Sequence, residues 1–417
     1  MNNGYILLIL LVTSCTAPGD NIGIIEDLSR DRSIPYQIWL PNAEADMAKF
    51  PLVILSHGSG GEYSNHAWLI DSLVETGFIV AALNHPMNTT RNNTDEGVIS
   101  VWHRPRDISV LLDYLLKDSN WVDVIDENRV GAAGFSSGGY TVLALAGAIY
   151  DSELMSGYCT SDEAGKDCQL ATDSSNVDFS DSTASYKDER IKSVFAMAPA
   201  VGSAITKESL NGIELPVFII ASKDDELVSP KYGAIRYAEN IPLSDLVLLP
   251  SGGHFIFLQC NAITTVVDWF NSELDLCGTN FSVDRDEIRE MVSAKAVSFL
   301  MSLRTKINPL IWHPTFKKIR GNLRDPNAKI ATHEEIVQQL SDPKVRAQLL
   351  AEHDAVIRQN SHKPVGSTSL IIGYDNLFPW QEDYEPDPAV DSIGAIARAQ
   401  NKHPLDVLID HLLFMFD

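Results

Sequence analysis

Runs of consecutive apolar residues alternate along the chain with segments that have the spacing of amphipathic helices. The apolar runs cover residues 50–61, 78–86, 129–136, 191–202, 215–225 and 244–254. Residues 66–77 and 104–118 are the clearest helical segments. Continuous apolar runs are typical of parallel strands that are buried on both faces, and strands alternating with helices form a parallel sheet that helices cover. The sequence therefore predicts an α/β fold with a mostly parallel sheet and helices on both of its faces.

The segment 130–148, VGAAGFSSGGYTVLALAGA, crowds glycines around two serines where a strand is followed by a helix. Gly134, Ser136 and Gly138 form the pattern G-x-S-x-G, the nucleophile elbow of serine hydrolases. Such a turn exposes the central hydroxyl at the sheet edge and points the next amide, that of Ser137, at a reacting carbonyl. We predict Ser136 as a nucleophile, with Ser137 as the competing serine and a glycine-rich turn without chemistry as the alternative.

A serine hydroxyl needs a base, and the base needs a carboxylate that orients it. His254 follows an apolar strand and two glycines, and it is the predicted base. The carboxylate is Asp224 or Asp225, which directly follow another strand. We prefer Asp225, because a valine, Val228, stands three residues after it, as is common in this motif. We expect the other aspartate to be a solvated loop residue. The order Ser, Asp, His is that of the α/β-hydrolases.

The remaining requirement is a pair of amides that stabilise an oxyanion. The loop SHGSGG, residues 56–61, follows a central strand and offers a second backbone N–H besides that of Ser137. Ser59 is the predicted donor, with Gly60 as the alternative. We expect His57 to maintain the shape of this loop rather than to transfer protons.

Residues 151–189 are rich in Ser and Asp, have no periodicity and interrupt the alternation. A long loop in a compact domain is usually functional or disordered, and we predict a lid-like insertion beside the site. Short loops favour the disulfides Cys159–Cys168 and Cys260–Cys277, with four unrelated thiols as the alternative. Disulfides favour an exported protein, and no cysteine or histidine spacing indicates zinc.

The chain carries 32 Lys and Arg against 56 Asp and Glu, a formal charge of −24, which excludes nucleic acid as a favourable partner. Residues 5–12 are apolar but too few to span a bilayer, and they suit a signal peptide. VTSC, at 12–15, resembles a bacterial lipobox, in which Cys15 is diacylated. We predict a lipoprotein signal peptide at 1–14 and a protein anchored in the periplasm or at the outer membrane; a plain secretory signal and a cytoplasmic protein are the alternatives.

Six motifs in order, from PLVILSHGSGG to GGHFIFLQC, resemble the predicted dienelactone-hydrolase-like branch of the α/β-hydrolases, near the bacterial platelet-activating-factor-acetylhydrolase-like enzymes. The resemblance covers residues 24–302. It implies an eight-stranded sheet, carboxylic ester hydrolysis, a triad of Ser136, Asp225 and His254, and oxyanion donors at Ser59 and Ser137. We predict no cofactor and no metal.

The organisation changes after residue 302. Residues 305–417, and most clearly 383–413, resemble part of the D-aminoacylase-like amidohydrolases, whose barrel binds metal through histidines. No H-x-H pair is present, and this segment is too short to close such a barrel. We therefore expect a mainly helical, non-catalytic tail at 303–417, in which the histidines are surface residues (His333, His353, His403 and His411).

The predicted organisation is a signal peptide at 1–14, a linker at 15–34, a hydrolase domain at 35–302 and the tail at 303–417. The hydrolase domain is expected to begin with an edge strand at 34–41. The predicted function is a serine esterase or lipase-like acyl hydrolase acting on a small-molecule or lipid ester. The alternatives are a metal-dependent N-acyl-amino-acid deacylase in the tail and a catalytically silent surface lipoprotein.

Overall fold

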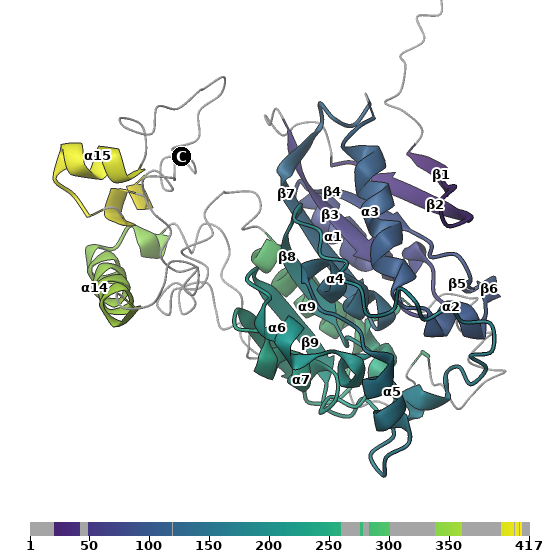
Figure 1. The fold of residues 1–417 in the computed structure, drawn as a ribbon. Coiled ribbons are helices and arrows are strands. Elements are labelled where there is room, and N and C mark those ends of the chain that lie inside the picture. The colour runs from purple at the N-terminus through teal and green to yellow at the C-terminus, as the bar shows by residue number, and fades with distance from the viewer. Residues whose placement is uncertain are drawn as a thin grey trace, which may run out of the picture.

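An eight-stranded sheet forms the centre of the protein, in the order β1-β2-β4-β3-β7-β8-β9-β10 (Figure 1). The computed structural model describes residues 21–41, 49–118, 120–259, 276–277, 283–300, 338–360, 393–403, 405–407 and 409–410. The strands of the sheet are β1 (Ile22–Asp27), β2 (Arg32–Trp39), β3 (Phe50–Ser56), β4 (Ile79–Leu83), β7 (Ile125–Phe135), β8 (Ile191–Met197), β9 (Val217–Ser222) and β10 (Ser244–Leu249). The short strands β5 (Asn88–Thr89) and β6 (Asn92–Asn93) form a separate hairpin.

Within the eight-stranded sheet, β4, β3, β7, β8, β9 and β10 pair in parallel, whereas β1 pairs antiparallel with β2, and β2 pairs antiparallel with β4. Every residue of β4 and β9 is buried, as continuous apolar runs require of parallel strands with both faces covered. This order and direction are those of the α/β-hydrolase fold, so the predicted fold class is confirmed.

The N-terminal edge of the sheet differs from the prediction. Residues 22–27, expected within the linker, form β1, and β2 lies between β1 and β4 instead of at the edge. Ile22 and Ile24 are each 62% exposed, so β1 lacks the pattern of a strand with one buried face. The strand forms because β2 supplies backbone partners along its whole length, from Ile22 opposite Gln37 to Asp27 opposite Arg32.

Helices cover both faces of the sheet, and two further helices among the described residues belong to the C-terminal extension (Figure 1). Their bounds are α1 (Ala67–Glu75), α2 (Asp95–Ile99), α3 (His103–Leu115), α4 (Ser137–Ala146), α5 (Ser152–Cys159), α6 (Lys207–Asn211), α7 (Ala234–Asn240), α9 (Arg285–Leu300), α14 (Pro343–Asn360) and α15 (Ile393–Gln400), with 3₁₀ turns η1 (Tyr63–His66), η2 (Lys166–Gln169), η3 (Gly202–Ala204) and η4 (His254–Phe257). The crossovers through α1 and α3 run in opposite directions along the sheet, and right-handed crossovers then place these helices on opposite faces. Helix α9 packs against α1, and α4 packs against α3.

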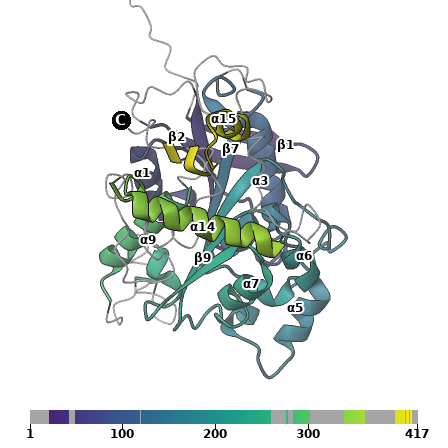
Figure 2. The same cartoon turned by 90° about the vertical axis from the view of Figure 1, so that its left-hand side faces the viewer.

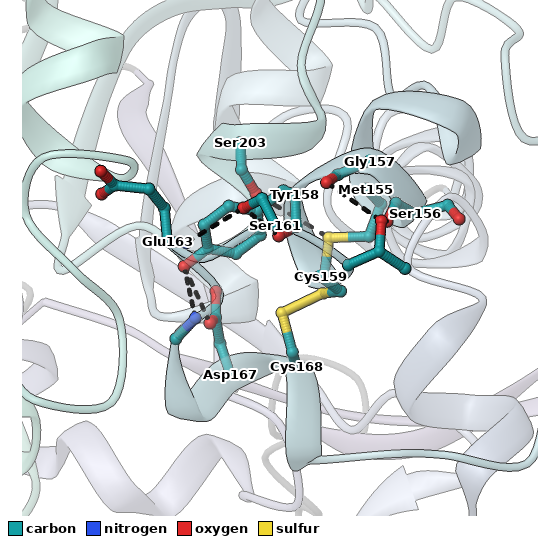
Figure 3. Close-up of a disulfide and its surroundings, with 12 residues drawn as sticks. Met155, Ser156, Gly157, Tyr158, Cys159, Ser161, Glu163, Asp167, Cys168 and Ser203 are labelled. Carbon is teal, nitrogen blue, oxygen red and sulfur yellow. Dashed lines mark hydrogen bonds between the residues drawn. A yellow bond between two sulfur atoms is a disulfide. The ribbon is translucent and has the colours of Figure 1, made fainter.

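The insertion at 151–189 contains a helix and a disulfide (Figure 3). The carboxylate of Asp151 caps α5 by accepting hydrogen bonds from two backbone amides of its first turn. A disulfide joins Cys159, at the end of α5, to Cys168 in η2. The residues that precede the two cysteines are also joined, because the Tyr158 hydroxyl donates to Asp167 Oδ1 at 3.2 Å. The insertion therefore has local structure that its composition did not predict, and its residues Met155, Val177 and Tyr186 pack against the main hydrophobic core.

In the C-terminal extension, α14 contacts the short segment that follows α15 (Figures 1 and 2). Arg346 on α14 pairs with Asp406 at 2.9 Å and with Asp410 at 2.5 Å. None of the described helices is long and apolar enough to cross a membrane. The predictions for residues 1–14, Cys15, Cys260 and most of 303–417 fall outside the residues that the structure describes.

Candidate active site

Ser136 lies in the sharp turn between β7 and α4. Its backbone has φ 54° and ψ −118°, a strained conformation for a residue with a side chain. A Cβ added to Gly134 would lie 2.2 Å from the carbonyl oxygen of Gly138, and one added to Gly138 would lie 2.0 Å from that of Ser56. The turn therefore requires glycine at both positions, which is the physical basis of the G-x-S-x-G pattern here.

The structure brings Ser136, His254 and Asp225 into one hydrogen-bonded row. His254 Nε2 is 2.9 Å from Ser136 Oγ, and His254 Nδ1 is 2.7 Å from Asp225 Oδ2. The residues are 7%, 4% and 6% exposed, respectively. With Nδ1 donating to the carboxylate, Nε2 is free to accept the serine proton. The row has the geometry of a nucleophile, a base and an orienting acid.

The loop after β9 fixes the orientation of Asp225. Its Oδ1 accepts hydrogen bonds from the amides of Leu227, at 3.0 Å, and Val228, at 2.8 Å. This leaves Oδ2 facing His254. The valine three residues after the acid, which favoured Asp225 in the sequence, thus contributes its backbone amide to the arrangement.

Both carboxylate oxygens of Asp224 are bonded to the loop that carries His254. Asp224 accepts hydrogen bonds from Ser222 Oγ at 2.5 Å, Ser251 Oγ at 2.8 Å and the Gly253 amide at 2.9 Å. Burial alone would raise the pKa of Asp224, but these hydrogen bonds outweigh it and lower the pKa below its ordinary value. The residue is exposed, as expected of a loop carboxylate, but its ties to the loop before His254 were not predicted.

Two backbone segments meet at Ser136. The loop after β3 passes so closely that a Cβ on Gly58 would lie 3.3 Å from Ser136 Cβ. In this loop, Ser59 Oγ accepts a hydrogen bond from Asn88 Nδ2 at 2.9 Å. From the other side, Ser137 is the first residue of α4, where backbone N–H groups have no partner within the helix. Ser59 and Ser137 therefore lie in the two segments that flank the serine.

His57 is buried and both of its ring nitrogens are occupied. Nε2 accepts from the His85 amide at 3.1 Å, so the proton is on Nδ1, which lies 2.7 Å from the carbonyl oxygen of Gly58. Burial and then the charge of Arg104 hold the pKa of His57 well below its ordinary value. A neutral, fully engaged imidazole fits the expected role of maintaining the loop.

A second row of Ser, His and Asp lies beneath this loop and was not predicted. His85 Nε2 is 2.9 Å from Ser56 Oγ, and His85 Nδ1 is 3.0 Å from Asp107 Oδ2. Asp107 also pairs with Arg32 at 2.8 Å and with Arg30 at 2.9 Å. Ser56, His85 and Asp107 are each 0% exposed, so no substrate reaches them and the row is structural.

Within the described residues, no group of three or more His, Cys, Asp or Glu side chains is arranged to bind a metal ion. Of the tail histidines, His333 and His411 lie outside the described residues. His403 Nδ1 accepts a hydrogen bond from the Leu405 amide at 3.1 Å.

No family model matches the sequence. Over 96 residues the chain is 34% identical to cutinase est1 and 33% identical to cutinase est2, both from Thermobifida alba. The match covers 22% of this chain and 29% of the length of each cutinase. Among solved structures, Est1E from Butyrivibrio proteoclasticus has a TM-score of 0.37 at 14% identity, covering 61% of this chain and 98% of its own. A ferulic acid esterase from Streptomyces cinnamoneus has a TM-score of 0.48 at 16% identity, covering 76% and 98%.

Proposed function

We propose that the protein is a serine-dependent carboxylic ester hydrolase. The observation that carries this proposal is the row from Ser136 Oγ through the His254 imidazole to Asp225, with distances of 2.9 and 2.7 Å. The strained elbow and the loop after β3 next to it supply the expected surroundings of such a nucleophile. The partial sequence match to two cutinases supports the same reaction class.

In the proposed mechanism, His254 removes the proton of Ser136 as the serine oxygen attacks the ester carbonyl. The amides of Ser59 and Ser137 stabilise the resulting oxyanion, and one such donor is typically worth about 3–4 kcal/mol of barrier. His254 then protonates the departing alcohol, which leaves an acyl-enzyme on Ser136. Water, activated by the same imidazole, releases the acid and restores the serine. Asp225 stabilises the imidazolium in both steps.

We further propose that the insertion at 151–189 borders the path of the ester. On one side, Lys166 of the insertion forms an ion pair at 2.8 Å with Glu226, the residue after Asp225. On the other side, Asp181 pairs with Arg106 of α3 at 3.0 Å. Burial, together with the charge of Asp225, raises the pKa of Asp167, which is consistent with a position of the insertion near the triad.

The subfamily and the location of the protein are also proposals. The six motifs support the dienelactone-hydrolase-like branch near the platelet-activating-factor-acetylhydrolase-like enzymes. The disulfide between Cys159 and Cys168 supports export, because such bonds persist in oxidising compartments. If Cys15 is diacylated and anchors the protein, radiolabelled palmitate should be incorporated into the wild-type protein and not into Cys15→Ala. We propose no catalytic role for the tail at 303–417.

The proposed reaction is tested by steady-state hydrolysis of p-nitrophenyl butyrate by the full chain. Ser136→Ala is expected to abolish turnover, whereas Ser137→Ala is expected to retain it, because the proposed role of Ser137 uses its backbone amide. Undiminished turnover by Ser136→Ala would assign the activity to another group. An inactive but folded wild type would instead favour a silent surface protein.

A further inference from the structure

The motif RPRD at the start of α3 places a buried arginine beside the candidate site. Arg104 is in the first turn of α3 and is 1% exposed. A fully buried arginine is rare, because removing its charge from water is costly, so its contacts need an explanation.

The guanidinium group of Arg104 reaches the loop after β3 in two ways. Its Nη2 donates directly to the carbonyl oxygen of His57. Its Nη1 donates to Asn88 Oδ1 at 2.6 Å, and Asn88 Nδ2 in turn donates to Ser59 Oγ at 2.9 Å. The arginine thus fixes the backbone two residues before Ser59 and, through Asn88, the Ser59 side chain.

The third donor of the same group reaches the helix that follows the nucleophile. Arg104 Nε donates to Thr141 Oγ1 at 3.1 Å. Thr141 Oγ1 in turn donates to the carbonyl oxygen of Ser137 at 2.7 Å. One planar group therefore connects both segments that carry the proposed oxyanion donors.

The positive charge of Arg104 has no carboxylate in direct contact among the described ion pairs. Its hydrogen-bond acceptors are neutral oxygens, and the nearby Asp107 pairs directly with Arg30, Arg32 and His85. Burial lowers the pKa of Arg104 to about 9, so the group is charged at neutral pH. The positive charge of the Arg104 guanidinium should therefore stabilise the negative charge of the oxyanion that forms in the proposed reaction.

We propose that Arg104 is a positioning residue for ester hydrolysis, which sets the spacing between the Ser59 and Ser137 amides and so prepares them for the oxyanion. This inference rests on the proposed function. It adds a residue that does not touch the substrate and acts through His57, Asn88 and Thr141.

The test compares the full-chain wild type with Arg104→Met and Arg104→Lys in hydrolysis of p-nitrophenyl butyrate. An interaction made only in the transition state lowers kcat and leaves KM nearly unchanged. Arg104→Met is expected to lower kcat roughly 10- to 100-fold, with KM within about threefold of wild type. Its Ki for butylboronic acid, which mimics the tetrahedral intermediate, should rise by a similar factor. Arg104→Lys should recover part of kcat.

Arg236→Met is the matched control, because Arg236 donates to two loop carbonyls, those of Gly202 and Ile205, at 2.7 Å each. It is expected to lower Tm and to keep kcat within about twofold. A kcat for Arg104→Met equal to that of the control, or a loss confined to KM, would overturn the inference. If Arg104→Met does not fold, Asn88→Ala and Thr141→Val each remove one connection. Unchanged kcat in both would also overturn it.

The experiment separates this inference from the proposed function. If the proposed function fails, the wild type does not hydrolyse the ester and no Arg104 variant can be ranked by kcat. If only the inference fails, the wild type and Arg104→Met turn over the ester alike, while Ser136→Ala does not.

Discussion

The ring of Phe135 packs against the imidazole of His254, with centroids 4.9 Å apart and planes inclined by 39°. Phe255 contacts the same imidazole edge-on at 5.0 Å. Phe135 is the last residue of β7 and directly precedes Ser136, so the strand that leads to Ser136 also supports the imidazole of His254. The orientation of His254 therefore depends on packing as well as on its hydrogen bond to Asp225.

Replacing Phe135 with alanine should affect both stability and catalysis. Phe135 is 2% exposed, and loss of a buried phenylalanine ring typically costs about 3–5 kcal/mol. The imidazole also gains freedom, so kcat should fall. Urea unfolding and ester hydrolysis measure the two effects. Phe218→Ala, in the core between β8 and β10, is the control: it should lose similar stability with less effect on kcat. Equal kcat in the two variants would contradict a supporting role for Phe135.

Substitutions of the two neighbouring carboxylates after β9, Asp224 and Asp225, should have different effects. Asp225→Asn is expected to lower kcat by about 10⁴, because the amide favours the wrong tautomer of the histidine. Asp224→Asn weakens hydrogen bonds to the Gly253 loop and should chiefly lower Tm, with a loss of kcat below about tenfold. Steady-state kinetics and thermal unfolding of both variants provide the comparison. The reverse ranking of kcat would make Asp224 the functional acid.

Asp107 should make the fold sensitive to acid. Burial alone would raise its pKa, but the hydrogen bond from His85 and the charge of Arg32 outweigh it, so the pKa of Asp107 is far below its ordinary value. A carboxylate whose pKa is lower in the folded state contributes fully above its unfolded pKa, about 3.9, and loses that contribution as the pH falls further.

Asp107→Asn should therefore cost about 3–5 kcal/mol at pH 7, because it leaves buried cations without their partner. The difference in the free energy of unfolding between the variant and wild type should become smaller below about pH 4. Urea unfolding from pH 3 to pH 7 measures this. Asp181→Asn, which removes an exposed partner of Arg106, should cost less than about 1 kcal/mol at every pH. If the difference in the free energy of unfolding between Asp107→Asn and wild type stayed constant with pH, the charge of Asp107 would not stabilise the fold.

Reduction of the disulfide should loosen the insertion. Cys159 and Cys168 are 9 residues apart, and closing so short a loop is worth about 2–3 kcal/mol in the chain-entropy account. The double variant Cys159→Ser, Cys168→Ser should unfold at a lower urea concentration than wild type. Dithiothreitol should bring wild type towards the variant and leave the variant unchanged. Equal stability of oxidised wild type and the variant would contradict this role.

The elbow was predictable because it is local: strand, turn and helix follow one another within a few residues. The nearness of Asp225 and His254 to Ser136 was also predictable, since the carboxyl ends of parallel strands meet at one edge of a sheet. The contacts of Arg104 were not, because its partners Asn88, Thr141 and His57 lie 16 to 47 residues away in the sequence and give no periodic signal. Strand β1 was missed because two of its three isoleucines, Ile22 and Ile24, are exposed, and its pairing with β2 leaves no pattern in its own sequence.

The central claim is that Ser136 becomes an acylated nucleophile. The most direct measurement is mass spectrometry of the full chain after reaction with a fluorophosphonate, which traps an activated serine. We predict a single adduct per chain, mapped by proteolysis to Ser136, none in Ser136→Ala, and slower labelling after His254→Ala. An adduct on another residue, or equal labelling of Ser136→Ala, would contradict the account.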